Sequence, residues 1–219
     1  MTKCLMISFP KDGDSFPSEG WRPFPASSKI PLADFRGLGL SLCCMESSTE
    51  YLIVSGSLRS ESRSRGMAYF LADCYRSEGV AAQVIDLRSI PLPFCDGEEA
   101  YDHQSVIALA KAISEARVII VATPIYNFDA SAALKNLIEL TGSSWEDKVV
   151  GFLCAAGGSM SYMSVMSFAN SLMLDFRCLI IPRIVYATSE DFTDGRLSSS
   201  IVQDRIRGLA RASVRIRNS

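Results

Sequence analysis

The sequence predicts an α/β fold in which helices cover both faces of a doubly wound, five-stranded parallel sheet. Short apolar runs without alternation, such as 52–54 and 118–122, suit strands that are buried on both faces of such a sheet. Stretches with apolar residues at helical spacing separate these runs. The alternation of strands and helices predicts a doubly wound sheet, for which two strand orders are common. Of these two orders, a chain with five strands favours 2-1-3-4-5.

The elements follow one another along the chain with clear end signals. After the first strand, apolar residues between positions 67 and 75 fall on one helical face, and Gly79 stands where a left-handed residue commonly ends a helix. Gly142 closes the third helix, and Pro182 is expected to bend the last strand. The predicted strands are 52–54, 82–87, 118–122, 149–154 and 178–181, and the predicted helices centre on 67–75, 106–113, 134–138, 162–175 and 199–215.

The first part of the chain has a different composition. Residues 1–49 contain recurrent proline and glycine and keep no helical or strand period, so we expect a flexible extension before an α/β domain at 50–219. Two interpretations stay open. The segment drapes over the domain through Trp21, Phe24 and Phe35, or it is upstream sequence and Met45 is the native start.

Composition and charge exclude several classes of function. A net charge of −2 and a pI near 5.5 provide no basic surface for nucleic acid or for an anionic membrane. Seven scattered cysteines without Cys-x-x-Cys spacing predict no metal site and favour a reducing, cytoplasmic location. The single histidine, His103, is expected on the surface at a helix start, which makes a Ser-His-Asp hydrolase improbable.

A Gly/Ser/Arg loop joins the first strand to the first helix. Gly56 ends the strand, and the side chains of Ser57, Arg59, Ser62 and Ser64 follow at the point where a helix presents unpaired N–H groups. A phosphate monoester fits such a site. The loop is neither a Walker A sequence nor a Gly-x-Gly-x-x-Gly sequence. The alternative is a solvated, well-capped helix start.

Two further unusual loops follow the third and fourth strands. Thr123-Pro124-Ile125-Tyr126-Asn127 comes after one, and Gly157-Gly158-Ser159 comes after the other. In the order 2-1-3-4-5, the carboxyl ends of strands one, three and four lie side by side, which is where open α/β sheets bind ligands. The three loops are therefore expected to form one binding site.

With these motifs in place, the sequence resembles the flavodoxin-like NAD(P)H-dependent FMN reductases, whose relatives include quinone, azo-dye and chromate reductases. The resemblance covers roughly residues 50–190 and depends on the order of the three loops. The resemblance implies a flavodoxin-like fold and bound FMN. It assigns the phosphate to Ser57, Arg59, Ser62 and Ser64, the flavin ring to Pro124, Ile125, Tyr126 and Asn127, and the pyrimidine edge of the ring to Gly157, Gly158 and Ser159.

Several roles within these loops stay open at this point. The Tyr126 ring either stacks on the flavin or packs under its loop, and Asn127 is either a ligand contact or a turn former. Relatives commonly carry glycine after the residue that corresponds to Asn127, whereas this chain has Phe128. Phe128 therefore covers the flavin, restricts the nicotinamide or packs in a subunit interface.

The resemblance implies an FMN-dependent oxidoreductase that passes a hydride from NADPH or NADH to a small acceptor such as a quinone or free flavin. No catalytic side chain is predicted, because the cofactor supplies the chemistry. By analogy we expect a homodimer or homotetramer. The alternatives are a flavodoxin-type electron carrier, which the mild charge of −2 disfavours, and a non-catalytic flavin-binding module.

Overall fold

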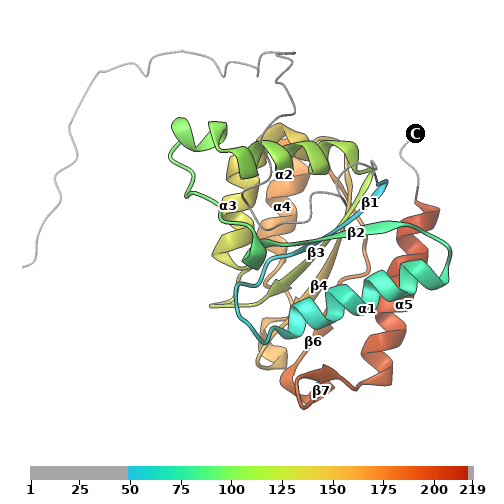
Figure 1. Ribbon diagram of the computed structural model, residues 1–219. Coiled ribbons are helices and arrows are strands. Elements are labelled where there is room, and N and C mark those ends of the chain that lie inside the picture. The colour runs from blue at the N-terminus through green and yellow to red at the C-terminus, as the bar shows by residue number, and fades with distance from the viewer. Residues whose placement is uncertain (1–48, 217–219) are drawn as a thin grey trace, which may run out of the picture. The chain divides into compact units, whose positions relative to one another are not determined.

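The computed structural model describes residues 49–216, and these form a three-layered α/β unit (Figure 1). The predicted extension, residues 1–49, lies outside the described residues except for Thr49, as does the proposed start at Met45. No helix in the described part of the chain is long and apolar enough to cross a membrane.

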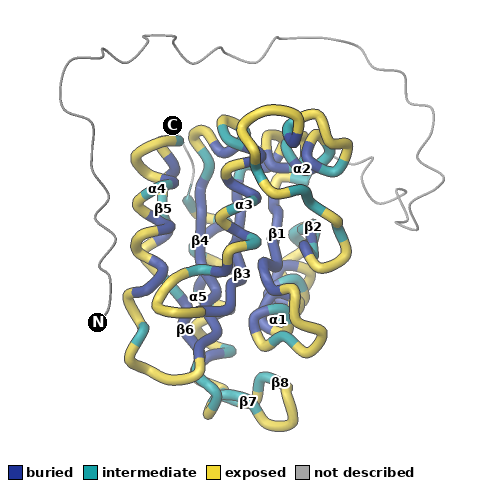
Figure 2. The backbone as a smooth tube through the Cα atoms, turned by 90° about the vertical axis from the view of Figure 1, so that its left-hand side faces the viewer, coloured by how far each residue is buried: buried dark blue, intermediate teal, exposed yellow. Residues whose placement is uncertain are grey.

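The central sheet has the predicted order, β2-β1-β3-β4-β5, and its strands pair in parallel. Its three inner strands, β1, β3 and β4, are buried along their whole length (Figure 2), as expected for apolar runs without alternation. The strands are Tyr51–Ser55 (β1), Ala82–Asp86 (β2), Val118–Pro124 (β3), Val149–Ala155 (β4), Leu179–Ile180 (β5), Val185–Ala187 (β6), Phe192–Thr193 (β7) and Arg196–Leu197 (β8).

Two helical layers enclose the sheet. Helices α1 and α5 cover one face and bury one apolar cluster, whereas α2, α3 and α4 cover the other face and bury a second cluster (Figure 1). Leu134 of α3 and Leu209 of α5, both fully buried, are typical of the two clusters. The α-helices are Arg63–Ser77 (α1), Gln104–Glu115 (α2), Ala132–Thr141 (α3), Met166–Phe176 (α4) and Ser200–Arg215 (α5), and the 3₁₀ turns are Leu87–Ser89 (η2), Glu99–Asp102 (η3), Gly142–Trp145 (η4), Ser159–Ser161 (η5) and Ser189–Asp191 (η6).

The predicted fifth strand, 178–181, is wrong in its extent. The chain pairs with β4 as β5, leaves it around Pro182 and pairs with it again as β6, so the sheet has six strands. Proline has no N–H to donate, and the break begins beside it. Between the two pairings this edge advances from Ile180 to Val185 while β4 advances only from Val150 to Leu153, so two residues are looped out.

Two other differences lie at the end of the chain. The helix predicted at 162–175 begins only at Met166, because a 3₁₀ turn at 159–161 and a further turn at 162–165 precede it. The antiparallel pair β7–β8 closes on a turn in which Asp194 and Gly195 have φ of 49° and 74°, a local signal that the sequence interpretation missed. His103 is an exposed N-cap of α2, as predicted, and its Nδ1 accepts a hydrogen bond from the Ser105 N–H.

Candidate flavin site at the carboxyl edge of the sheet

The three predicted loops lie on the same edge of the sheet and are hydrogen-bonded to neighbouring strands. The Gly56 N–H donates to the carbonyl of Ala122 in β3 at 2.8 Å, and the Ile125 N–H donates to the carbonyl of Ala155 in β4 at 2.9 Å. The hydroxyl of Ser131, which caps α3, donates to the Gly56 carbonyl at 2.8 Å. The structure therefore brings the loops after β1, β3 and β4 together.

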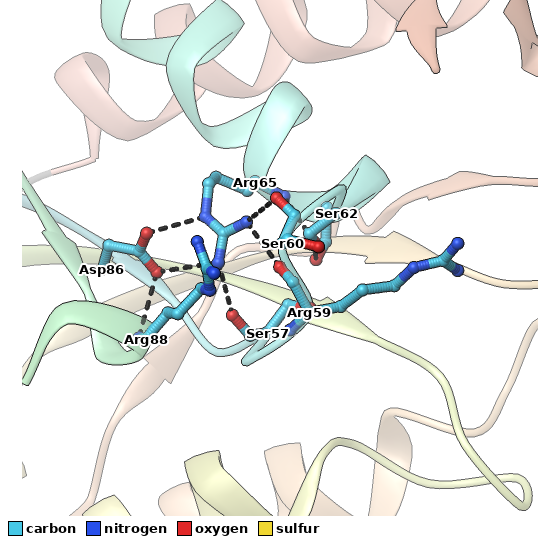
Figure 3. A network of polar contacts seen from close by, with 8 residues as sticks. Ser57, Arg59, Ser60, Ser62, Arg65, Asp86 and Arg88 are labelled. Atoms are coloured by element: carbon cyan, nitrogen blue, oxygen red, sulfur yellow. Dashed lines mark hydrogen bonds and ion pairs between the residues drawn. The ribbon is translucent and has the colours of Figure 1, made fainter. Parts of the chain in front are cut away.

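Two of the serine side chains in and just after the loop that follows β1 are buried. Ser57 and Ser64 are only 2% and 1% exposed. Ser62 is the N-cap of α1: its hydroxyl accepts from the Arg65 N–H at 3.2 Å and lies 3.0 Å from the hydroxyl of Ser64. Arg59 is exposed, and its side chain extends away from the polar network around Ser57 (Figure 3).

Sequence reasoning missed two charged residues that hold this loop. Arg65, in the first turn of α1, forms an ion pair with Asp86, the last residue of β2, with 2.7 Å between Nε and Oδ2 (Figure 3). A signal was available, because a carboxylate at the carboxyl end of the strand next to β1 lies near the start of α1 in a doubly wound sheet. The pair adds no net charge to the loop.

The loop after β3 forms a tight turn that is partly exposed to solvent. The backbone N–H of Tyr126 donates to the Asp129 carbonyl, and the Asp129 N–H donates back to Tyr126, both at 3.0 Å. Between them, Asn127 and Phe128 have φ of 49° and 65°, the left-handed region that glycine favours. Asn127 is thus a turn former. Tyr126 is 53% exposed, so its side chain is not buried under the loop.

The loop after β4 contains glycines that the surrounding protein does not require. A Cβ added to Gly157 or Gly158 would meet no atom of the described structure within 4 Å, and neither residue has a positive φ. Their carbonyls accept hydrogen bonds from side chains that sequence reasoning also missed: Ser189 Oγ donates to Gly157 at 2.9 Å and Tyr186 Oη donates to Gly158 at 2.7 Å. Glycine here leaves open space for a ligand that approaches the backbone.

A carboxylate caps the 3₁₀ turn that carries one of these two side chains, Ser189. Asp191 accepts hydrogen bonds from the backbone N–H and the hydroxyl of Thr188, which forms a capping box around the 3₁₀ turn that carries Ser189. Partial burial acts to raise the pKa of Asp191, but hydrogen bonds from Thr188 and Ser199 outweigh it and hold this pKa below its ordinary value. The carboxylate is therefore ionised near neutral pH.

These residues fit a phosphorylated flavin. In residues 49–216, the backbone N–H groups of Ser60 in the first loop and Gly158 in the third donate no hydrogen bond. Such N–H groups at a helix start suit a phosphate, and N–H groups beside glycine suit the carbonyls of a flavin's pyrimidine edge. No group of metal-ligating side chains occurs among the described residues.

A comparison with protein families identifies the chain. The model of the family described as NADPH-dependent FMN reductase matches residues 49–193, a range that contains all three loops. The chain belongs to this family. The predicted resemblance is confirmed. The prediction of an oxidoreductase that uses FMN and NAD(P)H is also confirmed at the level of the family. The electron-carrier alternative is not favoured.

Individual relatives agree with this assignment. The chain is 31% identical over 137 residues to an NAD(P)H-dependent FAD/FMN reductase of Geobacillus thermodenitrificans. The aligned region covers 60% of this chain and 72% of that protein. The chain is 32% identical over 111 residues to an NADPH:quinone oxidoreductase of Arabidopsis thaliana, with 48% of this chain and 57% of that protein covered.

Solved structures confirm the flavodoxin-like fold. The flavoenzyme NAD(P)H:(acceptor) oxidoreductase FerB of Paracoccus denitrificans superposes with a TM-score of 0.62 at 19% identity, and covers 76% of this chain and 95% of its own. A flavodoxin, WrbA-like protein of Agrobacterium tumefaciens gives a TM-score of 0.50 at 18% identity, with 75% and 99% covered.

Proposed function

We propose that this protein binds FMN across the three loops and uses it to oxidise NADPH or NADH and reduce a small acceptor such as a quinone or free flavin. Ser57, Arg59, Ser62 and Ser64 would hold the phosphate, residues 124–127 would border the ring, and 157–159 would contact its pyrimidine edge. The observation that carries the proposal is the set of backbone N–H groups without acceptors, in residues 49–216, at two loops on one edge of the sheet.

Bound FMN would supply the hydride chemistry, since it accepts a hydride from nicotinamide and passes reducing equivalents on. The chain's own residues bind and orient. Arg59 is free to swing toward the phosphate, because its exposed guanidinium donates no hydrogen bond to any residue in the described range. Backbone N–H groups of Gly158 and Ser159 would stabilise negative charge that develops on the pyrimidine edge.

The deciding experiment is the visible spectrum of the purified protein, with FMN added if needed, followed by NADPH or NADH with and without a quinone. We expect a flavin spectrum that bleaches with a nicotinamide and recovers when quinone is added. Protein that cannot be reconstituted with FMN would favour the binding module. A flavin spectrum that neither nicotinamide bleaches would favour the electron carrier.

The assigned phosphate residues are tested by combining Ser57→Ala with Arg59→Ala. Loss of a hydroxyl and a charge-assisted hydrogen bond should weaken FMN binding by about tenfold or more. The matched control is Arg76→Ala on α1, whose side chain is 78% exposed and pairs only with Asp73 among the described residues. FMN titration by fluorescence quenching checks this, and unchanged affinity in the double variant would remove these residues from the site.

We also propose a homodimer or homotetramer in the cytoplasm. Apolar side chains close to the proposed site are exposed, with Phe128 59% and Met160 91% accessible, and such side chains often mark interfaces. The four cysteines in the described range are free thiols, as expected in a reducing compartment. Light scattering during gel filtration tests the oligomer, and a monomeric mass would reject it.

A further inference from the structure

Arg65 is fully committed to bonds within the protein. Its Nε donates to Asp86 Oδ2 at 2.7 Å, and Nη2 donates to Asp86 Oδ1 at 3.2 Å and to the Ser57 carbonyl at 2.7 Å. Nη1 donates to the carbonyls of Arg59 and Ser60 at 2.7 and 2.9 Å. A guanidinium has five N–H donors, and all of them are used here. Arg65 therefore has no donor left for a ligand.

The three carbonyls that Arg65 holds fix the direction of three N–H groups. In a planar trans peptide, the C=O of one residue points opposite to the N–H of the next. Holding the carbonyls of Ser57, Arg59 and Ser60 toward the guanidinium therefore turns the N–H groups of Leu58, Ser60 and Glu61 to the other side of the loop. Across residues 49–216, none of these three N–H groups has an acceptor.

Asp86 keeps the guanidinium in this place. Its two carboxylate oxygens accept from Arg65, and Oδ1 also accepts from the Arg88 N–H at 3.2 Å, at the start of η2 (Figure 3). The two side chains are 11% and 17% exposed, so water competes little for their bonds. Asp86 pairs with Ser55 in the sheet register, which ties the loop to the end of β2.

We propose that Arg65, anchored by Asp86, is a positioning residue that aims the N–H groups of Leu58, Ser60 and Glu61 at the FMN phosphate without contacting it. The inference rests on the proposed FMN site and deepens it. An anion receives its bonds from the backbone, while the arginine, whose side chain is 11% exposed, acts from behind the loop. The sequence position of Arg65, beside Ser62 and Ser64, would otherwise suggest a direct phosphate ligand.

The test compares FMN with riboflavin, which lacks the phosphate, by fluorescence titration of wild type, Arg65→Lys and Asp86→Asn. Lysine keeps the charge but cannot form the five-bond fork. We expect Arg65→Lys to raise the Kd for FMN by about tenfold or more and to leave the Kd for riboflavin within about twofold. An equal loss for both ligands would indicate a general structural role and overturn the proposal.

Asp86→Asn separates positioning from direct contact by the sign of its effect. If Arg65 touched the phosphate, removal of the nearby negative charge would strengthen FMN binding. If it positions the backbone, the loss of its anchor weakens FMN binding and spares riboflavin. Tighter or unchanged FMN binding would therefore overturn the proposal. This variant also carries the test alone if Arg65→Lys does not fold.

Arg76→Lys, on the exposed side of α1, is the matched control and should change neither Kd. Failure of the proposed function looks different: wild type would then bind neither FMN nor riboflavin. Wild type that binds FMN, together with variants that bind it equally well, would reject only the role of Arg65.

Discussion

The loops after β1 and β4 reach the same arrangement by different chemistry. Both turn their carbonyls toward side chains behind the loop and leave N–H groups without acceptors in the described structure. A charged pair, Arg65 and Asp86, does this after β1, whereas neutral hydroxyls of Tyr186 and Ser189 do it after β4. The difference matches the ligand parts proposed for each loop, since a dianionic phosphate is matched by a rigid, charge-balanced support, and a ring edge with less charge than a phosphate needs only dipoles.

The loop after β3 contrasts with both of them. It is closed by its own backbone bonds and holds Asn127 and Phe128 in the left-handed region. Its aromatic side chains, Tyr126 and Phe128, are exposed, and in the proposed site they would lie where nicotinamide and acceptor approach. The molecule thus combines two supported loops with one strained, exposed turn.

The largest expected effect on stability comes from a substitution at Gly56, where the first loop packs against α3. A Cβ on Gly56 would lie 2.3–2.8 Å from atoms of the Leu134 side chain, which is fully buried at the start of α3. We expect Gly56→Ala to lower the free energy of unfolding by about 1–3 kcal/mol, measured by urea denaturation.

Gly66→Ala is the control for that variant, because no atom lies within 4 Å of a Cβ there and Gly66 is inside α1. It should stabilise the protein by about 0.5–1 kcal/mol. Shortening the clashing side chain with Leu134→Val should reduce the cost of Gly56→Ala. An equal cost in both backgrounds would contradict the contact as its cause.

A second variant sharpens the contrast between the charged and the neutral support. Tyr186→Phe removes the hydroxyl that donates to the Gly158 carbonyl at 2.7 Å. Loss of about 1 kcal/mol corresponds to a roughly fivefold weaker affinity. Because the ring is common to both ligands, FMN and riboflavin should weaken equally, unlike in the Arg65 variants. A loss confined to FMN in fluorescence titrations would reject the assignment of the Gly-Gly loop to the ring.

A third variant relieves the strained turn. Phe128 has a φ of 65°, which disfavours a side chain with a Cβ. Phe128→Gly should therefore raise the free energy of unfolding by about 0.5–1 kcal/mol. Phe94→Gly, at a residue that is 86% exposed and has no positive φ, should give no such gain. Thermal unfolding of both variants is the measurement, and destabilisation by Phe128→Gly would mean that the ring packs against the protein.

The smallest effect concerns pH. The pKa of Asp191 is lowered in the folded state, so its hydrogen bonds contribute stability above the ordinary aspartate value of about 3.9. That contribution disappears as the pH falls through the lowered pKa. As the pH falls from about 5 to below the ordinary aspartate pKa, the free energy of unfolding of Asp191→Asn should therefore decrease less than that of wild type. Urea titrations at a series of pH values measure this difference. Asp204→Asn, on the exposed face of α5, is the control. If the free energy of unfolding of Asp191→Asn depended on pH as it does in wild type, the capping role would be contradicted.

The sequence by itself determined the order of the sheet and the edge of the sheet at which the three loops lie. Apolar runs around Ile53, Ile120 and Phe152 have no alternation, so they had to be central strands, and the loops that follow parallel strands necessarily share one edge. Local chemistry also predicted a helix start within the Gly/Ser/Arg loop and a bend at Pro182, and the structure places the N-cap at Ser62.

Only the tertiary structure decided which groups support the loops. The pairing of Arg65 with Asp86 spans 21 positions, and that of Tyr186 with Gly158 spans 28, so neither is a local sequence pattern. The doubly wound topology indicates only that Asp86 lies near the start of α1, not which side chain it pairs with. The return of the chain to β4 as β6 likewise depends on residues Leu153–Ala155 of β4, which pair with β6, and not on Pro182 alone. Periodicity encodes which face of an element is buried, whereas partners for side-chain hydrogen bonds depend on how distant elements are placed in space.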